Sequence, residues 1–86
     1  MTTWVSIYYR ESHLSRRDVA SLFFQVAGFT TTASEVRSQA SGVVRFRIHG
    51  HYNRVIETTL NRRITDIDPL AVVRINGQRY GERGLL

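Results

Sequence analysis

The stretch that decides the fold is the run Val43-Val44-Arg45-Phe46-Arg47-Ile48-His49. Apolar and basic residues alternate within it, in the order Val44, Arg45, Phe46, Arg47 and Ile48. Successive side chains of a β-strand point to opposite faces of a sheet. The alternation therefore predicts a strand over 43–49 that buries its apolar side chains and presents both arginines on the outward face.

A helix is predicted upstream of this strand. Ser15 and Asp18 have the Ser-x-x-acid spacing of a helix start, where the two side chains bind free backbone N–H groups. Behind them, apolar residues recur at intervals of three and four, as on a buried helix face: Val19, Leu22, Phe23, Val26 and Ala27. Gly28 is predicted to end this helix at a position where a positive φ costs glycine little.

A second helix is predicted downstream, over 53–64. One stripe of its surface carries the residues expected to face the core: Val55, Ile56, Thr59, Leu60 and Ile64. Pro69 blocks the continuation of this helix, because proline lacks a backbone N–H and clashes with the preceding turn.

Four further strands complete the predicted sheet. Their β-branched and aromatic content, or their place after a turn, puts them at 4–9, 30–37, 70–75 and 78–80. Residues 38–42 are predicted as a turn, and Asn76-Gly77 as a two-residue hairpin. The element order is then β-α-β-β-α-β with a C-terminal hairpin. It predicts one α+β domain over 1–86, with the ferredoxin-like arrangement of two helices on one face of an antiparallel sheet.

Composition bounds the classes of function. The chain has 86 residues, no cysteine and a net charge of +5, and all 12 of its basic residues are arginine. No apolar run approaches the roughly 18 residues of a membrane span, and Met1–Trp4 does not start a secretory signal. We therefore expect a cytoplasmic protein without disulfides, and without a membrane partner. Arginine favours planar, bidentate contacts to carboxylate or phosphate, although a GC-rich genome also explains its use in place of lysine.

Catalytic and metal-binding patterns are sparse. His49 and His51 are the only close pair of histidines, and they lack a third ligand at a suitable spacing. Asp66 and Asp68 precede Pro69, where aspartate is favoured for local turn hydrogen bonds. No serine or threonine lies in a nucleophile elbow, and no glycine-rich phosphate loop follows the first strand. We expect neither an enzyme, nor a cofactor, nor a metal site.

The outward sheet face is the candidate site. Arg45 and Arg47 share it by alternation, Arg74 joins them if Val73 and Ile75 point inward, and Arg37 is expected beside them. The first strand adds either Ser6 and Tyr8 or Ile7 and Tyr9. Arginines beside tyrosine suit an anion or a nucleic acid. A solvated face that prevents aggregation and a protein-binding face are the alternatives.

The RNA-recognition pattern is incomplete on this face. Such sheets carry stacking aromatics on the third strand, whereas the aromatic residue of 41–48 is Phe46, which is expected on the core side. Self-association or a protein partner is therefore predicted over nucleic acid.

The run 23–31, Phe-Phe-Gln-Val-Ala-Gly-Phe-Thr-Thr, resembles the helix end of ACT domains in the small regulatory subunits of acetolactate synthase. The spacing of Val55-Ile56, Leu60, Ile67 and Val72-Val73, and the closing segment 81–86, are similar to the same family. The resemblance covers most of the chain and uses features general to ACT domains.

This resemblance implies a noncatalytic, ACT-like subunit that forms a homodimer and activates a larger thiamine-diphosphate-dependent synthase. It also implies a branched-chain amino acid effector at the dimer interface. By position, the effector site would be formed by Arg10, Glu11, Ser12, His13, Leu14 and Thr30. Thr30 stands where the family usually has Asn, and the loop lacks the family's Asn-x-x-Gly pattern. Two alternatives stay open: a small inhibitor, of the kind phages encode, that binds a host protein, and a basic RNA- or DNA-binding module.

Overall fold

The computed structural model describes residues 2–28, 32–36, 40–49 and 53–79, and the statements below concern these residues. Seven elements follow one another along the chain: β1 (Thr2–Tyr8), α1 (Arg16–Ala27), β2 (Thr32–Val36), β3 (Val43–His49), α2 (Arg54–Ile67), β4 (Val72–Ile75) and β5 (Gln78–Arg79). The five strands form one antiparallel sheet in the order β2-β3-β1-β4-β5. The predicted ferredoxin-like α+β fold is confirmed.

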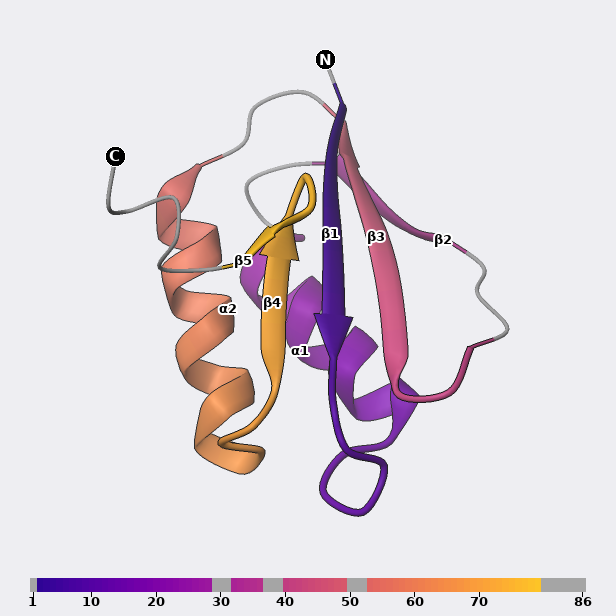
Figure 1. Cartoon of the computed structure of the whole chain (residues 1–86). Coiled ribbons are helices and arrows are strands. Elements are labelled where there is room, and N and C mark those ends of the chain that lie inside the picture. Colours follow the sequence, from indigo (N-terminus) through magenta and orange to yellow (C-terminus); the bar gives the residue numbers. More distant parts are fainter. Residues whose placement is uncertain (1, 29–31, 37–39, 50–52, 80–86) are drawn as a thin grey trace.

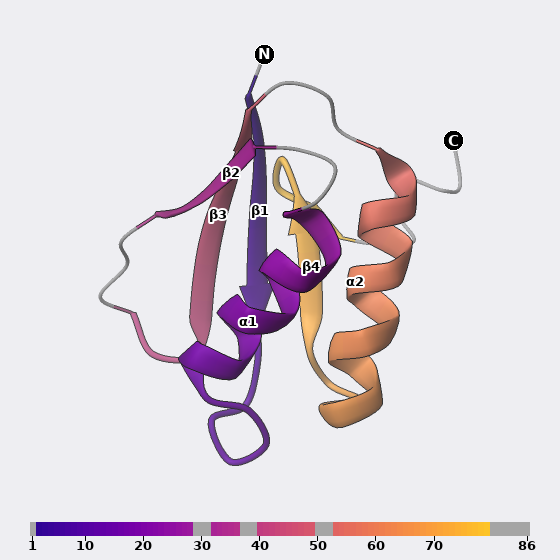
Figure 2. The same cartoon turned by 180° about the vertical axis from the view of Figure 1, so that it is seen from behind.

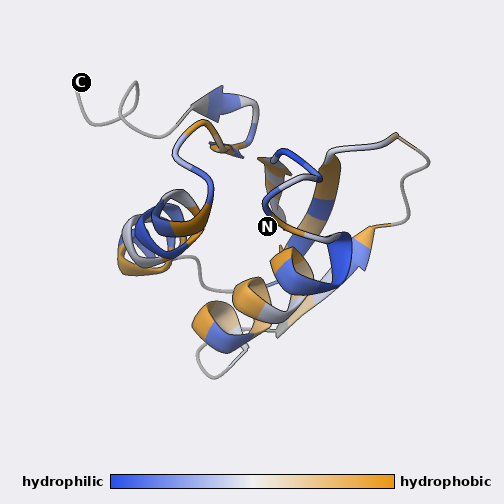
Figure 3. Ribbon diagram, turned by 90° about the horizontal axis from the view of Figure 1, so that it is seen from below, coloured by the Kyte–Doolittle hydropathy of each residue, from blue (hydrophilic) through white to orange (hydrophobic). Residues whose placement is uncertain are grey.

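Both helices cover the same face of the sheet, and the other face is left open (Figures 1 and 2). The view from below in Figure 3 shows α1 and α2 on one side of the strands. Within the described part of the chain, no helix has the length and apolar character needed to cross a membrane.

The central strand β1 sets the register of the sheet. Val5 and Ile7 lie opposite Phe46 and Val44 of β3, and on the other side they lie opposite Ile75 and Val73 of β4. All these side chains are buried against the helices. Because alternate residues share a face, the apolar side chains of these three strands form one continuous surface that packs against the helices.

The centre of the core is an aromatic contact between the sheet and α1. Phe23 of α1 stacks on Phe46 of β3, with ring centroids 3.8 Å apart and planes inclined by 7°. Phe24 meets both rings edge-on, at centroid distances of 5.3 and 5.6 Å. Leu60 and Ile64 of α2 are fully buried in the same cluster. The strand that predicts the fold thus also forms the aromatic contact with α1.

Helix α1 begins as predicted. The hydroxyl of Ser15 accepts a hydrogen bond from the Asp18 backbone N–H at 3.0 Å, and the Asp18 carboxylate accepts one from the Ser15 backbone N–H at 3.2 Å. Gly28 ends α1 as predicted, but the predicted positive φ is wrong, because Gly28 has a φ of −65°. Its N–H donates to the carbonyl of Phe24, and a Cβ at Gly28 would lie 2.5 Å from that oxygen. Close approach, rather than a positive φ, therefore favours glycine here.

Helix α2 differs from its prediction at two points. It extends to Ile67, and Asp68 follows as its C-cap. Val55 was expected in the core but is 66% exposed. The buried stripe instead runs through Ile56, Leu60 and Ile64, at intervals of four residues. Val55 lies one residue before this stripe, and one residue rotates the side chain by about 100° around a helix with 3.6 residues per turn.

Strand boundaries moved by one to two residues. Strand β1 begins at Thr2 and ends at Tyr8. Strand β4 begins at Val72 rather than Leu70, because Asp68 holds the preceding residues in a turn through the backbone N–H groups of Leu70 and Ala71. Of the predicted strands 30–37 and 78–80, the described parts are β2 and β5.

The hairpin at Asn76-Gly77 is confirmed. Asn76 has a φ of 51° and Gly77 a φ of 85°. Two consecutive positive φ values are the conformation that suits a two-residue connection between twisted antiparallel strands. The turn joins β4 to β5 and places Asn76 beside the start of β1, where its N–H donates to the carbonyl of Trp4 at 2.8 Å.

Candidate functional site

Six of the outward residues on the open face of the sheet, on three neighbouring strands, are here called the arginine face: Trp4, Ser6 and Tyr8 of β1, Arg45 and Arg47 of β3, and Arg74 of β4. Their partners along each strand point to the core, so alternation puts all six on the opposite side. Ser6 lies directly opposite Arg45 on one side and Arg74 on the other. The middle of the face is therefore a small hydroxyl residue between two guanidinium groups.

Two aromatic rings on this face are in contact with arginines. The guanidinium carbon of Arg47 lies 5.0 Å from the centroid of the Trp4 ring, and that of Arg74 lies 5.8 Å from the centroid of the Tyr8 ring. Both distances fall within the cation–π range. Trp4 is 43% exposed and Tyr8 is 37% exposed. Each ring is thus held by an arginine while much of the residue stays accessible.

The positive charge of the arginine face is not balanced by described acidic residues on the same face. Glu35 of β2 lies opposite Phe46, which places it on the helix side, and there it pairs with Arg16 at 3.3 Å. Asp68 pairs with Arg10 at the end of the sheet. Within the described ranges, Nε of Arg47 is a buried donor without a hydrogen-bond partner. The face therefore presents a positive potential, and one buried guanidinium donor beneath it has no hydrogen-bond partner among the described residues.

Two shallow hollows lie on the arginine face. The larger, of about 420 Å³, is lined by Trp4, Ser6, Val36, Arg45, Asn76 and Gly77. The smaller, of about 250 Å³, is lined by Tyr8, Val72 and Arg74. The larger hollow is within the roughly 300–1,000 Å³ typical of ligand pockets. Each hollow has one of the two aromatic residues and one arginine in its wall.

The structure brings together four of the five residues predicted for this face: Tyr8, Arg45, Arg47 and Arg74. The fifth, Arg37, lies outside the described residues. Of the two alternatives for the first strand, Ser6 and Tyr8 point outward, while Ile7 and Tyr9 are buried. Trp4 was missed, although alternation from Tyr8 through Ser6 leads to it directly.

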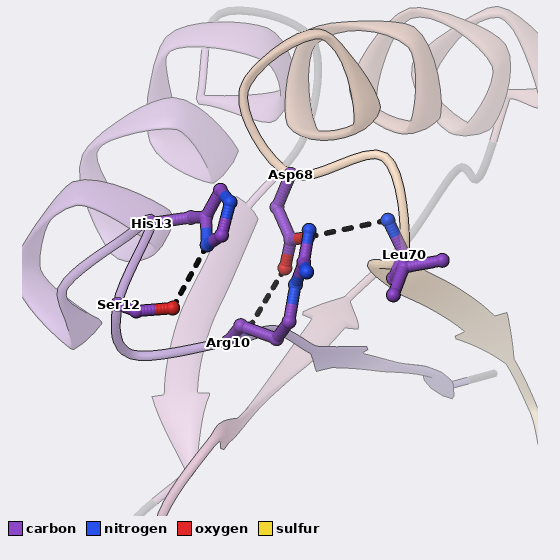
Figure 4. A network of polar contacts seen from close by, with 5 residues as sticks. All are labelled: Arg10, Ser12, His13, Asp68 and Leu70. Atoms are coloured by element: carbon purple, nitrogen blue, oxygen red, sulfur yellow. Dashed lines mark hydrogen bonds and ion pairs between the residues drawn. The ribbon is translucent and has the colours of Figure 1, made fainter.

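One end of the candidate effector loop is held in the fold by the contacts of Arg10 with Asp68 (Figure 4). Asp68 receives three contacts from Arg10: its Oδ1 lies 2.6 Å from Nη2 and 2.7 Å from Nε, and its Oδ2 accepts the backbone N–H at 2.8 Å. Leu14 was expected to line an effector site but is buried in the core. Glu11, Ser12 and His13 are exposed, and Thr30 lies outside the described residues.

Asp68 has a larger role than the predicted turn contact. One carboxylate oxygen does accept the backbone N–H of Leu70, at 3.2 Å. Its side chain is also fully buried and holds Arg10. The hydrogen bond from the Arg10 side chain is the main cause that lowers the pKa of the Asp68 carboxyl, although burial acts in the opposite direction. No sequence pattern links these two positions, because they are 58 residues apart.

The described residues offer little for catalysis or metal binding. They contain no group of three or more metal-ligating side chains, and His51 lies outside them. Ser12 Oγ lies 2.9 Å from Nδ1 of His13. Both residues are exposed, and Asp68, the nearby acid in Figure 4, is engaged by Arg10 and Leu70. Within the part of the chain that the structure describes, the His13 imidazole therefore has no hydrogen bond to a third group that would orient it as a general base.

Comparison with known proteins gives the fold and no family. No protein-family model matches the sequence, and no curated protein matches it. Among solved structures, the chain is similar to a de novo designed protein, Foldit4, with a TM-score of 0.59 and 17% sequence identity. The match covers 88% of this chain and 94% of the designed one. At this identity the likeness concerns the fold alone.

Proposed function

We propose that this protein is a noncatalytic binding domain that takes an anionic partner on the arginine face. The observation that carries the proposal is the placement of Arg45 and Arg47 on β3 and of Arg74 on β4, the two strands that flank β1, without a described acid beside them. Positive charge gathered on one face attracts anionic partners and speeds their encounter. Arginine also forms bidentate contacts with carboxylate and phosphate groups.

Self-association, which the sequence predicts as one of two options beside a protein partner, is disfavoured on this face. A two-fold dimer brings the same patch of each subunit together, so Arg45, Arg47 and Arg74 would meet their own copies. Like charges at close range repel, most strongly where water is excluded. A homodimer would have to use another surface, such as the edge strand β2.

The ACT-like regulatory role stays a prediction. Arg10 and Leu14 are engaged in the fold, so an effector in this loop would rely on Glu11, Ser12 and His13. Thermal unfolding with valine, leucine or isoleucine tests the role. A rise in Tm with one of them supports an effector site, because a ligand of the native state stabilises it. Unchanged Tm values with all three would count against it.

The binding proposal is tested by retention on immobilised heparin, which serves as a generic polyanion. The test variant is Arg45→Ala/Arg47→Ala/Arg74→Ala. The control variant is Arg54→Ala/Arg62→Ala/Arg63→Ala, whose arginines are exposed on α2. Each variant loses three positive charges, so the net charge falls from +5 to +2 (5 − 3 = 2) in both.

We expect the test variant to elute at clearly lower salt than the control. Equal elution of the two variants would show that net charge alone governs binding, and would contradict the proposal. Thermal unfolding of both variants establishes that the comparison is made between folded proteins.

A further inference from the structure

We infer that the anionic partner is a single-stranded nucleic acid, with bases stacked on Trp4 and Tyr8 and backbone phosphate held between Arg45 and Arg74. The inference rests on the proposed function and names the partner class of the same face. It is carried by the aromatic residues, which charge alone does not explain.

The aromatic residues are positioned as a stacking surface. Trp4 and Tyr8 lie on the central strand, on the open side, and are 43% and 37% exposed. Exposed large aromatics on a sheet face are stacking platforms in proteins that bind single strands. An arginine lies over each ring, which shows that both rings are open to a planar partner. In the complex a base would take the place of the guanidinium, whose positive charge would then lie close to the phosphates of the strand.

The spacing of the two rings favours a single strand over a duplex. Trp4 and Tyr8 are four residues apart on β1, and a strand rises about 3.3 Å per residue, so their Cα atoms are about 13 Å apart. Bases of a duplex follow one another at about 3.4 Å per strand and keep their faces covered by their neighbours. Bases can stack on both rings only when they are separated from each other, as in a single strand.

The charge lies where the backbone between two such bases would pass. Ser6 is midway between Trp4 and Tyr8, and it is flanked by Arg45 and Arg74 on the neighbouring strands. Strands are about 4.8 Å apart, so the two arginines start about 10 Å from each other across a small hydroxyl residue. In the structure Nη1 of Arg74 donates to the carbonyl of Gly77 at 3.3 Å. On binding, the Arg74 guanidinium would turn away from this contact and, together with that of Arg45, hold a phosphate above Ser6 through paired N–H donors.

The larger hollow provides room for a base beside Trp4. It has a volume of about 420 Å³, and Arg45 and Asn76 share its wall with the Trp4 residue. The Asn76 Oδ1 accepts the Trp4 backbone N–H at 2.9 Å. This hydrogen bond fixes the amide at the edge of the hollow, where it can meet the edge of a base. An acidic protein surface would bind the arginines, but it would not require a hollow beside Trp4 with an amide at its edge.

The experiment uses the intrinsic fluorescence of Trp4, because the chain contains one tryptophan. The wild-type chain is titrated with an unlabelled oligothymidylate, with an abasic oligonucleotide of the same length, with a duplex and with polyglutamate. Fluorescence anisotropy of labelled forms gives the affinities. We expect oligothymidylate to bind most tightly and to quench Trp4, and the abasic strand to bind more weakly with little quenching.

Substitutions separate stacking from charge. Tyr8→Ala is expected to weaken oligothymidylate binding by roughly fivefold or more, the lower end of the loss seen when a stacking ring is removed. Tyr8→Phe keeps a ring and is expected to retain most of the affinity. Arg45→Ala/Arg74→Ala is expected to weaken binding to the abasic strand as well. Thermal unfolding of each variant checks that it is folded.

The outcomes distinguish this inference from the proposed function. Binding that depends on the arginines, but with no Trp4 quenching and no effect of Tyr8→Ala, overturns the single-strand inference and leaves the anionic face intact. If polyglutamate or the duplex binds more tightly than oligothymidylate, the single-strand inference is likewise overturned and the anionic-partner proposal stands. No arginine-dependent binding to any of the four probes overturns both.

Discussion

Arg10 and Asp68 form an ion pair that joins the end of β1 to the end of α2, with Nη2 of Arg10 lying 2.6 Å from Oδ1 of Asp68. The carboxylate is fully buried, whereas the Arg10 side chain is 42% exposed. Asp68 also accepts the backbone N–H groups of Arg10 and Leu70. The Asp68 backbone thus ends α2 through its N–H, which donates to the carbonyl of Ile64. Its side chain starts the turn into β4 and holds the chain that leaves β1.

Replacing Asp68 is predicted to destabilise the protein more than replacing its neighbour. Asp68→Asn keeps the shape but puts an amide N–H₂ in place of one carboxylate oxygen. Either the Arg10 backbone N–H or the Arg10 side chain and the Leu70 N–H then lose their acceptor, and the ion pair is lost in both cases. We expect Tm to fall by several degrees, as for the loss of charge-assisted hydrogen bonds in a small domain. The control is Asp66→Asn, at an exposed position. Equal Tm values for the two variants would contradict the role given to Asp68.

The same carboxylate predicts a pH dependence of stability. The pKa of Asp68 is lowered in the folded protein, chiefly by the Arg10 side chain, so the unfolded state binds a proton more readily. The stabilisation is therefore present above the unfolded pKa of about 3.9. It is lost as pH falls through the lower folded pKa. Urea unfolding from about pH 6 to about pH 3 should show a decline in the free energy of unfolding that is smaller in Asp68→Asn. Parallel declines would refute the assignment.

The Phe23–Phe46 stack predicts a large loss of stability on truncation. Phe23 is fully buried and lies 3.8 Å from the Phe46 ring, centroid to centroid. Phe23→Ala is expected to lower the free energy of unfolding by about 3–5 kcal/mol, through lost burial and the cavity left behind. Phe24→Ala is the matched control, since Phe24 is adjacent and partly exposed. In chemical denaturation, Phe24→Ala should lower the free energy of unfolding clearly less than Phe23→Ala does. A larger decrease for Phe24→Ala would contradict the central place of Phe23 in the core.

The hairpin predicts that a side chain at Gly77 lowers the stability of the fold through backbone strain alone. Gly77 has a φ of 85°, and a Cβ placed there would meet no atom within 4 Å. Gly77→Ala should therefore cost about 1–2 kcal/mol, the price of a left-handed conformation for a residue with a side chain. Gln78→Ala, at the next exposed position, should change stability by less than about 0.5 kcal/mol. Chemical denaturation measures both, and a neutral Gly77→Ala would show that the turn adopts another conformation.

Most of the fold follows from local patterns in the sequence. The structure confirms three predictions of this kind: the alternation over 43–49, the capping pair Ser15 and Asp18, and the Asn76-Gly77 turn. Each depends on residues within a few positions of one another, so the backbone periodicity of a helix or strand reveals it directly. The wrong prediction for Val55 shows the limit of such patterns. A stripe of apolar residues on a helix does not specify which of its members face the centre of the core and which lie at its exposed margin.

The arginine face depends both on a local sequence pattern and on the tertiary structure. Alternation by itself determined that Arg45 and Arg47 share one side of β3. Only the tertiary structure decided that Trp4 and Tyr8 lie between them and Arg74, because β1 pairs with β3 and β4 at long range. The Arg10–Asp68 contact has the same origin. Sequence periodicity specifies which side of its own element a side chain faces, and the pairing of distant elements specifies what it meets there.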